Sequence, residues 1–240
     1  MLMLAGGCTV TPPPPDGEIV PDDVPAFADA DFTDPTAIDN PYLPLVPGAV
    51  RNYRAHTEDG VETIIVEVLE DRREVMGVTC VVVRDRVFLD DVLIEDTHDW
   101  YAQDDDGNVW YMGEEVDNYN YDDAGNLIDI THEGAWEAGK DVAGLGEVAS
   151  PGYVMLSSPK EGDVYYQEFY RGEAEDIGLV VELGVSVTLA DGSEYTCLKT
   201  RDYTPLEPGH VEFKYYAPGI GVVLEEVEET GERVELESFE

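Results

Sequence analysis

From about residue 50 onward, apolar and polar residues alternate along the chain with a period of two. In residues 61–70 (VETIIVEVLE), the alternation places Ile64, Val66 and Val68 on one face of a strand. Residues 179–189 (LVVELGVSVTL) alternate for longer and place six apolar residues on one face, namely Leu179, Val181, Leu183, Val185, Val187 and Leu189. A period of two is typical of a half-buried β-strand rather than of a helix.

Short polar segments rich in Asp, Gly and Asn separate these alternating stretches. Asp-Gly and Gly-Asn pairs readily adopt the positive φ angles that tight hairpins require. We therefore predict hairpin turns at EDG (58–60), DD (90–91), DDDGN (104–108), DDAGN (122–126), ADGS (190–193) and ETG (229–231).

No long stretch has apolar residues at helical spacing. The best candidate for a short helix or an ordered loop, residues 136–150, is too rich in glycine for a long helix. The pattern predicts an all-β protein of roughly ten to twelve strands, joined mostly by short turns as an antiparallel meander. A meander of this size leaves exposed edges unless it curls, so we expect a barrel or half-barrel.

Composition divides the chain into three parts. Residues 1–8 form a short apolar leader, residues 9–35 a tether rich in Thr, Pro and Asp, and residues 36–240 a single β-barrel-like domain. Within that domain, residues 39–48 (DNPYLPLVPG) are apolar but contain three prolines. We predict that they pack as a non-helical strap over one end of the sheet.

The charge of the chain is strongly negative. Asp and Glu number 54 against 13 Lys and Arg, which gives a formal net charge of −41. Such a surface repels nucleic acid and anionic lipid headgroups, and we exclude both as electrostatic partners. The excess of acids fits a high-salt environment, where self-repulsion is screened, and equally an ordinary acidic secreted protein.

The first residues, MLMLAGGC, place small residues between an apolar stretch and Cys8, and a proline-rich segment follows. This arrangement resembles the lipobox of bacterial and archaeal lipoproteins, with Cys8 as the lipidated residue. It lacks a basic n-region and is too short for a complete signal peptide. The resemblance implies an extracellular or cell-envelope protein that meets the membrane only through its lipid anchor.

The remaining cysteines, Cys80 and Cys197, form an even pair. An exported chain could join them in a disulfide, provided that their strands are neighbours. Two buried free thiols in separate strands are the alternative, and the sequence does not distinguish the two.

The DDDGN segment offers oxygen ligands at alternate positions, from Asp104, Asp106 and Asn108. Calcium takes six to eight oxygen ligands, often from closely spaced Asp side chains. The residues that follow read as a strand, however, and would carry Glu114 and Glu115 away from the loop. We favour a plain hairpin turn and keep a weak Ca²⁺ site as the alternative; no other cofactor is indicated.

Large aromatic residues flank this turn on both sides. Trp100, Tyr101, Trp110 and Tyr111 place rings on the faces of one hairpin, and an aromatic-lined barrel mouth can hold an apolar or amphipathic ligand. Cross-strand packing of aromatic pairs explains the same residues without a ligand. We take these four as the candidate ligand-binding residues.

Catalytic motifs are weak in this chain. Glu168 and Glu173 are candidates for the acid and base of a glycoside hydrolase, but a chain with so many acids produces such clusters by chance. The four histidines have no metal-binding spacing, and no G-x-S-x-G motif is present.

Several segments resemble a family of uncharacterised exported bacterial proteins, some of them lipoproteins. The similar segments include DNPYLPLVPG (39–48), DWYAQDDDGNVWYMGEE (99–115) and TPLEPGHVEFKYYAPGIGVV (204–223). The last segment also resembles a turn in open β-barrel envelope lipoproteins, which are similar to carriers that hold an acyl chain on a concave apolar face. The resemblance implies no activity and assigns no residue a role.

Taken together, these patterns favour a non-enzymatic binding module of the cell envelope with a small apolar or amphipathic ligand. A carboxylate-based hydrolase and a cation-stabilised structural protein are the alternatives. A deep cavity favours the first, whereas a filled barrel favours a structural role. The oligomeric state and the identity of the ligand do not follow from the sequence.

Overall fold

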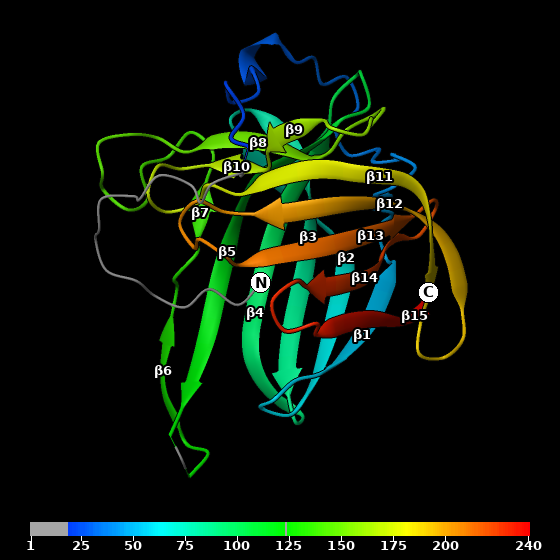
Figure 1. Ribbon diagram of the computed structural model, residues 1–240. Coiled ribbons are helices and arrows are strands. Elements are labelled where there is room, and N and C mark those ends of the chain that lie inside the picture. Colours follow the sequence, from blue (N-terminus) through cyan, green and yellow to red (C-terminus); the bar gives the residue numbers. More distant parts are fainter. Residues whose placement is uncertain (1–18, 123) are drawn as a thin grey trace.

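The computed structural model describes residues 19–122 and 124–240, and these residues form an all-β protein (Figure 1). A single 3-10 turn, η1 (Phe27–Asp29), precedes the sheet. The strands are β1 (Val50–His56), β2 (Val61–Val75), β3 (Val78–Leu89), β4 (Val92–Gln103), β5 (Val109–Tyr121), β6 (Leu127–Thr131), β7 (Trp136–Glu137), β8 (Ser150–Met155), β9 (Val164–Tyr166), β10 (Glu168–Phe169), β11 (Ile177–Thr188), β12 (Glu194–Tyr203), β13 (Val211–Ala217), β14 (Gly221–Val227) and β15 (Arg233–Phe239).

The strands form one antiparallel sheet that curls into a nearly closed barrel, which confirms the predicted fold class (Figure 1). The hydrogen-bonded order is β10-β8-β5-β4-β3-β2-β1-β15-β14-β13-β12-β11-β9, and β6 and β7 both pair with β5. Fifteen strands exceed the predicted ten to twelve because β7, β9 and β10 have only two or three residues each. Segments this short carry no recognisable alternation.

The barrel has one unsealed seam, between β9 and β10. β9 pairs with β11 and β10 pairs with β8, so the chain changes sides of the seam at Gln167. Gly152 of β8 faces this crossing, and a Cβ there would collide with the Tyr166 carbonyl oxygen. Close approach of two backbones therefore requires glycine at this position.

All six predicted hairpin turns connect strands in the structure. At residues 90–91, Asp90 and Asp91 both have positive φ (47° and 67°), as a two-residue turn between β3 and β4 requires. The predicted helix or loop at 136–150 is an ordered loop that contains β7 and no helix.

The alternation predicted for residues 179–189 is wrong in its first half. The register of β11 shifts twice against β12, between Val180 and Glu182 and between Leu183 and Val185. Because each shift changes the face on which a side chain lies, Val180 is buried whereas Leu183 is 39% exposed. The pattern from Val185 to Leu189 follows the prediction.

The segment 39–48 is a non-helical strap that packs against the barrel, as predicted. Its Leu45 is buried, and the Arg51 guanidinium donates hydrogen bonds to the Pro44 and Ile220 carbonyl oxygens (2.8 and 2.7 Å). The Gly219 amide donates to the Pro41 carbonyl oxygen at 2.8 Å. The strap is thus tied to the β13–β14 turn.

The boundary predicted at residue 36 lies too late in the chain. Phe27 and Phe32 pack on Trp110 with ring centroids 5.4 and 6.1 Å away, and Thr33 hydrogen-bonds to the Asp105 carboxylate. Residues 19–35 therefore cover the outside of the barrel rather than forming a free tether. The leader and its Cys8 lie outside the described residues.

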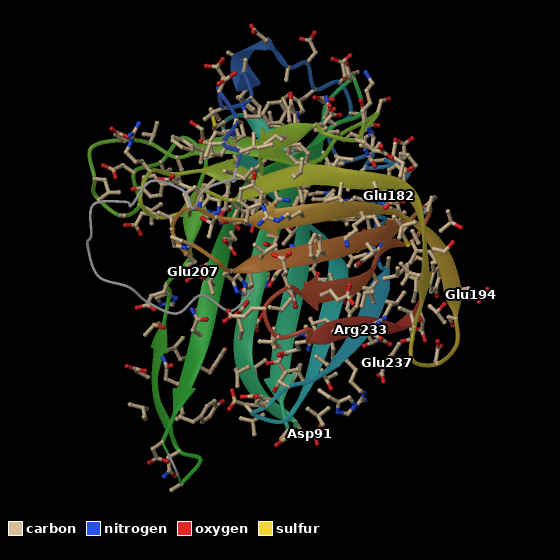
Figure 2. All side chains as sticks on the ribbon, viewed as in Figure 1. Asp91, Glu182, Glu194, Glu207, Arg233 and Glu237 are labelled. Carbon is tan, nitrogen blue, oxygen red and sulfur yellow. The ribbon has the colours of Figure 1, made fainter. Side chains whose placement is uncertain are left out.

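The two remaining cysteines are buried free thiols. Cys80 packs with Trp100 and Trp110, whereas Cys197 packs with Tyr53 and Val223 in another part of the core. The structure thus has the free-thiol alternative rather than the disulfide. No helix in the described part of the chain is long and apolar enough to cross a membrane. Figure 2 shows acidic side chains, among them the exposed Asp91, Glu182 and Glu194, projecting from the outer surface.

Candidate functional site

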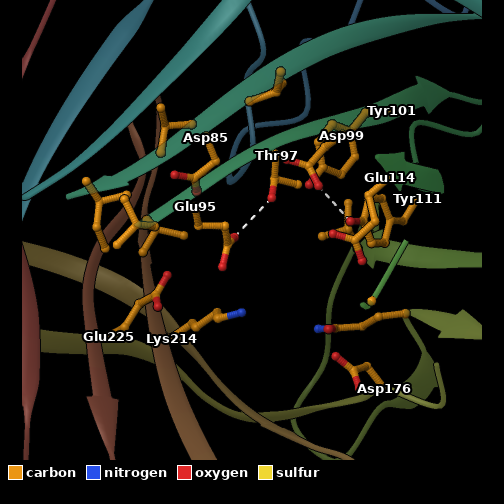
Figure 3. Close-up of a pocket in the computed structure, with 18 of the residues that line it drawn as sticks. Asp85, Glu95, Thr97, Asp99, Tyr101, Tyr111, Glu114, Asp176, Lys214 and Glu225 are labelled. Carbon is orange, nitrogen blue, oxygen red and sulfur yellow. Dashed lines mark hydrogen bonds between the residues drawn. The ribbon is translucent and has the colours of Figure 1, made fainter. Parts of the chain in front are cut away.

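The interior of the barrel contains a cavity of about 260 Å³ (Figure 3). Its wall combines apolar side chains, such as Ile64, Val66 and Val222, with an unusual number of acids. The described residues that line it include nine carboxylates but only two basic side chains, Arg51 and Lys214. The carboxylates are Asp85, Glu95, Asp99, Glu114, Glu133, Glu168, Asp176, Glu212 and Glu225. The exposed Glu133 shows where the cavity reaches the surface.

One wall of the cavity comes from β3, β4 and β5. Period-two geometry points Glu95, Thr97, Asp99 and Tyr101 of β4 inward together. Two polar contacts order this row, and both are drawn in Figure 3. The Thr97 hydroxyl donates to the Glu95 carboxylate at 3.0 Å, and the Tyr111 hydroxyl of β5 donates to the Asp99 carboxylate at 2.6 Å.

The facing wall carries Lys214 of β13, which points into the cavity beside Glu225 (Figure 3). Its ammonium nitrogen lies 3.3 Å from the Asp202 carboxylate and 3.9 Å from the Glu212 carboxylate. Burial opposes the charge of Lys214, but the surrounding carboxylates outweigh it and raise its pKa well above the usual value. These acids therefore share one cation of the chain itself.

A second group of acids forms no ion pair with a basic side chain of the described residues. Glu168 of β10 is 1% exposed, and both its carboxylate oxygens lack a hydrogen-bond partner in the described structure. One Asp176 oxygen is also unpartnered. The Trp136 indole N–H lies beside the Glu168 carboxylate and favours its ionised form, but the two groups are not in full hydrogen-bond geometry. Buried polar groups without partners are rare in folded proteins and require an explanation.

Burial and mutual repulsion raise the pKa of several cavity acids. Burial raises the pKa of Asp85 to about 7, with Asp99 and Glu95 adding to the effect. Burial also raises the pKa of Asp99 and of Asp176 to about 6, and it holds that of Glu168 well above its usual range. The cavity therefore titrates near neutral pH, where surface acids are fully ionised.

The four predicted ligand-binding aromatics divide between the two faces of the wall. Tyr101 and Tyr111 line the cavity and stack with ring centroids 5.1 Å apart. Trp100 and Trp110 are buried in the outer core and do not line it. Tyr101 and Tyr111 therefore lie where a ligand in the cavity would contact them, and their binding role stays a prediction. For the tryptophans the prediction is wrong, because other parts of the chain cover their strand face.

The DDDGN segment is a turn in which the side-chain oxygens of Asp104 and Asn108 already accept hydrogen bonds from the chain. The Asp104 carboxylate accepts hydrogen bonds from the Asn108 amide (2.8 Å), the Asn108 side chain (3.0 Å) and the Trp110 indole (2.8 Å). The Asn108 side-chain oxygen accepts one from the Ser157 amide (2.9 Å), and Asp106 is exposed. Within the described residues, no three His, Cys, Asp or Glu side chains are arranged to hold a metal ion. The calcium alternative thus finds no support here.

The proposed catalytic pair does not come together. Glu168 lines the cavity, but Glu173 is exposed in the turn that follows β10 and does not reach it. Paired carboxylates catalyse glycoside hydrolysis only when they flank the same bond. These two residues therefore cannot serve as its acid and base.

Sequence reasoning missed most of the acidic wall, although a signal was present. In β3, Asp85 interrupts an otherwise apolar alternation of Val81, Val83 and Val87. A charged residue on the apolar face of a predicted barrel strand indicates a polar interior. The contribution of Glu168 gave no such signal, because β10 has only two residues.

Comparisons with known proteins add little to this geometry. A scan against protein-family models and a search of curated proteins each give no match. Among solved structures, a protein described as a "putative lipoprotein" from Parabacteroides distasonis has a similar chain path, with 11% identical residues and a TM-score of 0.41. The similarity covers 83% of this chain and 98% of that chain, and at this level it supports no inference about a ligand.

Proposed function

We propose that this protein is a non-enzymatic binding module that holds a small amphipathic ligand inside its barrel. The observation that carries the proposal is the cavity itself, which combines apolar walls with unpartnered polar groups. A barrel with a purely structural role would be expected to fill this space with side chains. The sequence MLMLAGGC further supports a cell-envelope location with a lipid anchor at Cys8.

The size and lining of the cavity limit the ligand. Its volume of about 260 Å³ lies below the range of roughly 300–1,000 Å³ that accommodates drug-sized molecules. The ligand must therefore be small. Its apolar part would contact residues such as Leu45, Val66 and Val222, and its polar part would face the carboxylates.

Calorimetry with six-carbon probes tests the proposal on the purified domain. Because efficient small ligands gain at most about 1.5 kcal/mol per non-hydrogen atom, 1-hexanol and hexylamine are expected to bind in the micromolar to millimolar range. A cavity-filling variant, Val87→Phe, should abolish binding, because Val87 lines the cavity.

The matched control is Val92→Phe at the start of β4, where the side chain is exposed and lies outside the cavity. This variant should bind both probes as the original chain does. If no probe binds, or if Val87→Phe binds as well as the control while folded by circular dichroism, the proposed function is wrong.

A further inference from the structure

The buried acids in and around the cavity form two groups, and the groups differ in one respect. Asp202, Glu212 and Glu225 surround the ammonium of Lys214. The others, Asp99, Glu114, Glu168 and Asp176, form no ion pair with a basic side chain of the described residues, although the charge of Lys214 acts on Asp176 and Asp99. Figure 3 shows Asp99 and Glu114 on the upper wall and Asp176 with Lys214 and Glu225 on the lower wall. We call the second set the vacant acidic subsite.

From this difference we infer that the vacant acidic subsite binds the ammonium group of a small primary amine, an inference that rests on the proposed function. Glu168 is the central observation. It is 1% exposed and lines the cavity, and neither oxygen has a donor in full hydrogen-bond geometry, although the Trp136 indole N–H lies beside the carboxylate. A buried carboxylate in this condition must take up a proton, or be reached by a donor or a cation, because otherwise its desolvation is strongly destabilising.

The arrangement of acceptors favours an ammonium over other cations. The four acids come from separate elements, namely β4, β5, β10 and the segment just before β11. An ammonium has three rotatable donors that can reach separate acceptors, whereas a guanidinium presents a planar fork that suits a single carboxylate. A quaternary ammonium has no donor and depends on aromatic faces. Lys214 already shows that this cavity accommodates a primary ammonium among carboxylates.

The raised pKa values of the subsite acids make amine binding dependent on pH. Burial raises the pKa of Asp99 and Asp176 to about 6, so both acids are partly protonated slightly below neutral pH. The groups facing Asp99 are Tyr111, Glu114, Glu95 and, with the opposite charge, Lys214. Those around Asp176 are Lys214, Asp202, Glu212 and Thr204. A bound cation favours the ionised form, so binding must release protons and must tighten as the pH rises through 6.

The test compares hexylamine, 1-hexanol and hexanoate, which share one tail and differ in charge. At pH 7 and fixed ionic strength, hexylamine is expected to bind about tenfold or more tightly than 1-hexanol, and hexanoate should not bind. Titration in two buffers with different ionisation enthalpies should show proton release on binding of the amine and none for the alcohol.

Two variants locate the ammonium. Glu168→Gln should bind hexylamine no more tightly than 1-hexanol, while its affinity for 1-hexanol stays unchanged. The control Glu173→Gln changes the same residue type five positions away, in an exposed turn outside the cavity, and should retain the preference. Glu114→Gln offers a second change within the subsite if the first variant does not fold.

The outcomes separate the inference from the proposed function. If 1-hexanol and hexylamine bind equally and no proton is released, the ammonium subsite is wrong although the cavity still binds a ligand. If hexyltrimethylammonium binds as tightly as hexylamine, or if Ca²⁺ displaces the amine at constant ionic strength, the site is not one for primary amines. If no probe binds, both ideas fail.

Discussion

The two faces of the wall formed by β4 and β5 have opposite characters. Outward, Trp110 packs against Phe27 and Phe32, and the Arg73 guanidinium lies over the buried Trp100 ring. Inward, the same strands present acids and tyrosines to a cavity. Barrels of soluble proteins commonly bury their apolar face inside, so the usual order is partly reversed here.

The difference between the two faces shows that one strand can stabilise the fold with its outward side chains and form the cavity with its inward ones. Alternate residues point to opposite faces, so the outer row can be optimised for packing while the inner row keeps polar groups that reduce stability. The outer core is made possible by residues 19–35, which cover rings that would otherwise meet solvent. Changes on the outer face should therefore affect unfolding alone, whereas changes on the inner face should affect binding and often increase stability.

The largest expected effect is on the outer face, at Trp110. This side chain is 0% exposed, and its indole donates to the Asp104 carboxylate at 2.8 Å. Trp110→Ala should lower the free energy of unfolding by about 3–5 kcal/mol, measured by denaturant titration. Phe239→Ala, which removes a ring that is 43% exposed, should lower it by less than about 1 kcal/mol. Similar losses in both variants would contradict the description of the outer core.

The second-largest expected effect is an increase in the free energy of unfolding, and it comes from a residue on the inner face. Glu168→Met replaces a buried, unpartnered carboxylate with an apolar side chain of similar size. The free energy of unfolding should rise by about 1–3 kcal/mol, because the desolvation penalty of the carboxylate disappears. A loss of stability on denaturant titration would mean that Glu168 has a structural partner.

The pH dependence of stability should reveal Asp85. Burial raises the pKa of its carboxyl to about 7 in the folded state, above the value of about 3.9 in an unfolded chain. The folded state therefore holds this proton more tightly, and stability falls as the pH rises from about 4 to 7. The slope should be about 1.4 kcal/mol per pH unit for one proton.

Asp85→Asn isolates this contribution. At constant ionic strength, the free energy of unfolding of the variant should change less steeply with pH between 4 and 7, by about the contribution of one titrating proton. The contribution of the other charges to the pH dependence should be the same in both proteins. Equal slopes in both proteins, measured by thermal or denaturant unfolding, would show that Asp85 titrates normally.

The smallest effects compare two similar turns. Asp104 closes the β4–β5 turn and binds the Trp110 indole, whereas Asp122 caps the β5–β6 turn through Asn126 and is exposed. Asp104→Ala should cost about 1–3 kcal/mol and Asp122→Ala about 0.5 kcal/mol. Added Ca²⁺ should leave the melting temperature of the original chain unchanged beyond an ionic-strength control. A rise of several degrees would restore the calcium alternative for the DDDGN turn.

The sequence predicted the fold well because its signals are local. Alternation and turn chemistry act over a few residues, so the hairpins at 90–91 and 104–108 and the strand at 61–70 were readable. The bulges in β11 were not, because a register shift depends on the neighbouring strand. Likewise, residues 19–35 read as a linker, since nothing in their composition shows that Phe27 and Phe32 meet Trp110.

The candidate site was predicted only in part. Tyr101 and Tyr111 were identified, but the acids of the cavity were lost among the 54 in the chain. Distinguishing an inward acid from a surface acid requires the register of every strand, which the sequence does not fix. Glu168 lies on a two-residue strand beside the seam, so its burial arises only from the closure of the barrel.

Trp136 gives the protein an internal optical probe of its cavity. Its indole is buried, and its ring lies edge-on to Tyr111 with centroids 5.3 Å apart. Tyr111 forms part of the cavity wall, so a charged or apolar guest arriving there alters the electric field and polarity around the indole. With Trp100 and Trp110 replaced by phenylalanine, fluorescence emission would come from this one indole. Occupancy could then be followed without a label, in real time and with any colourless ligand.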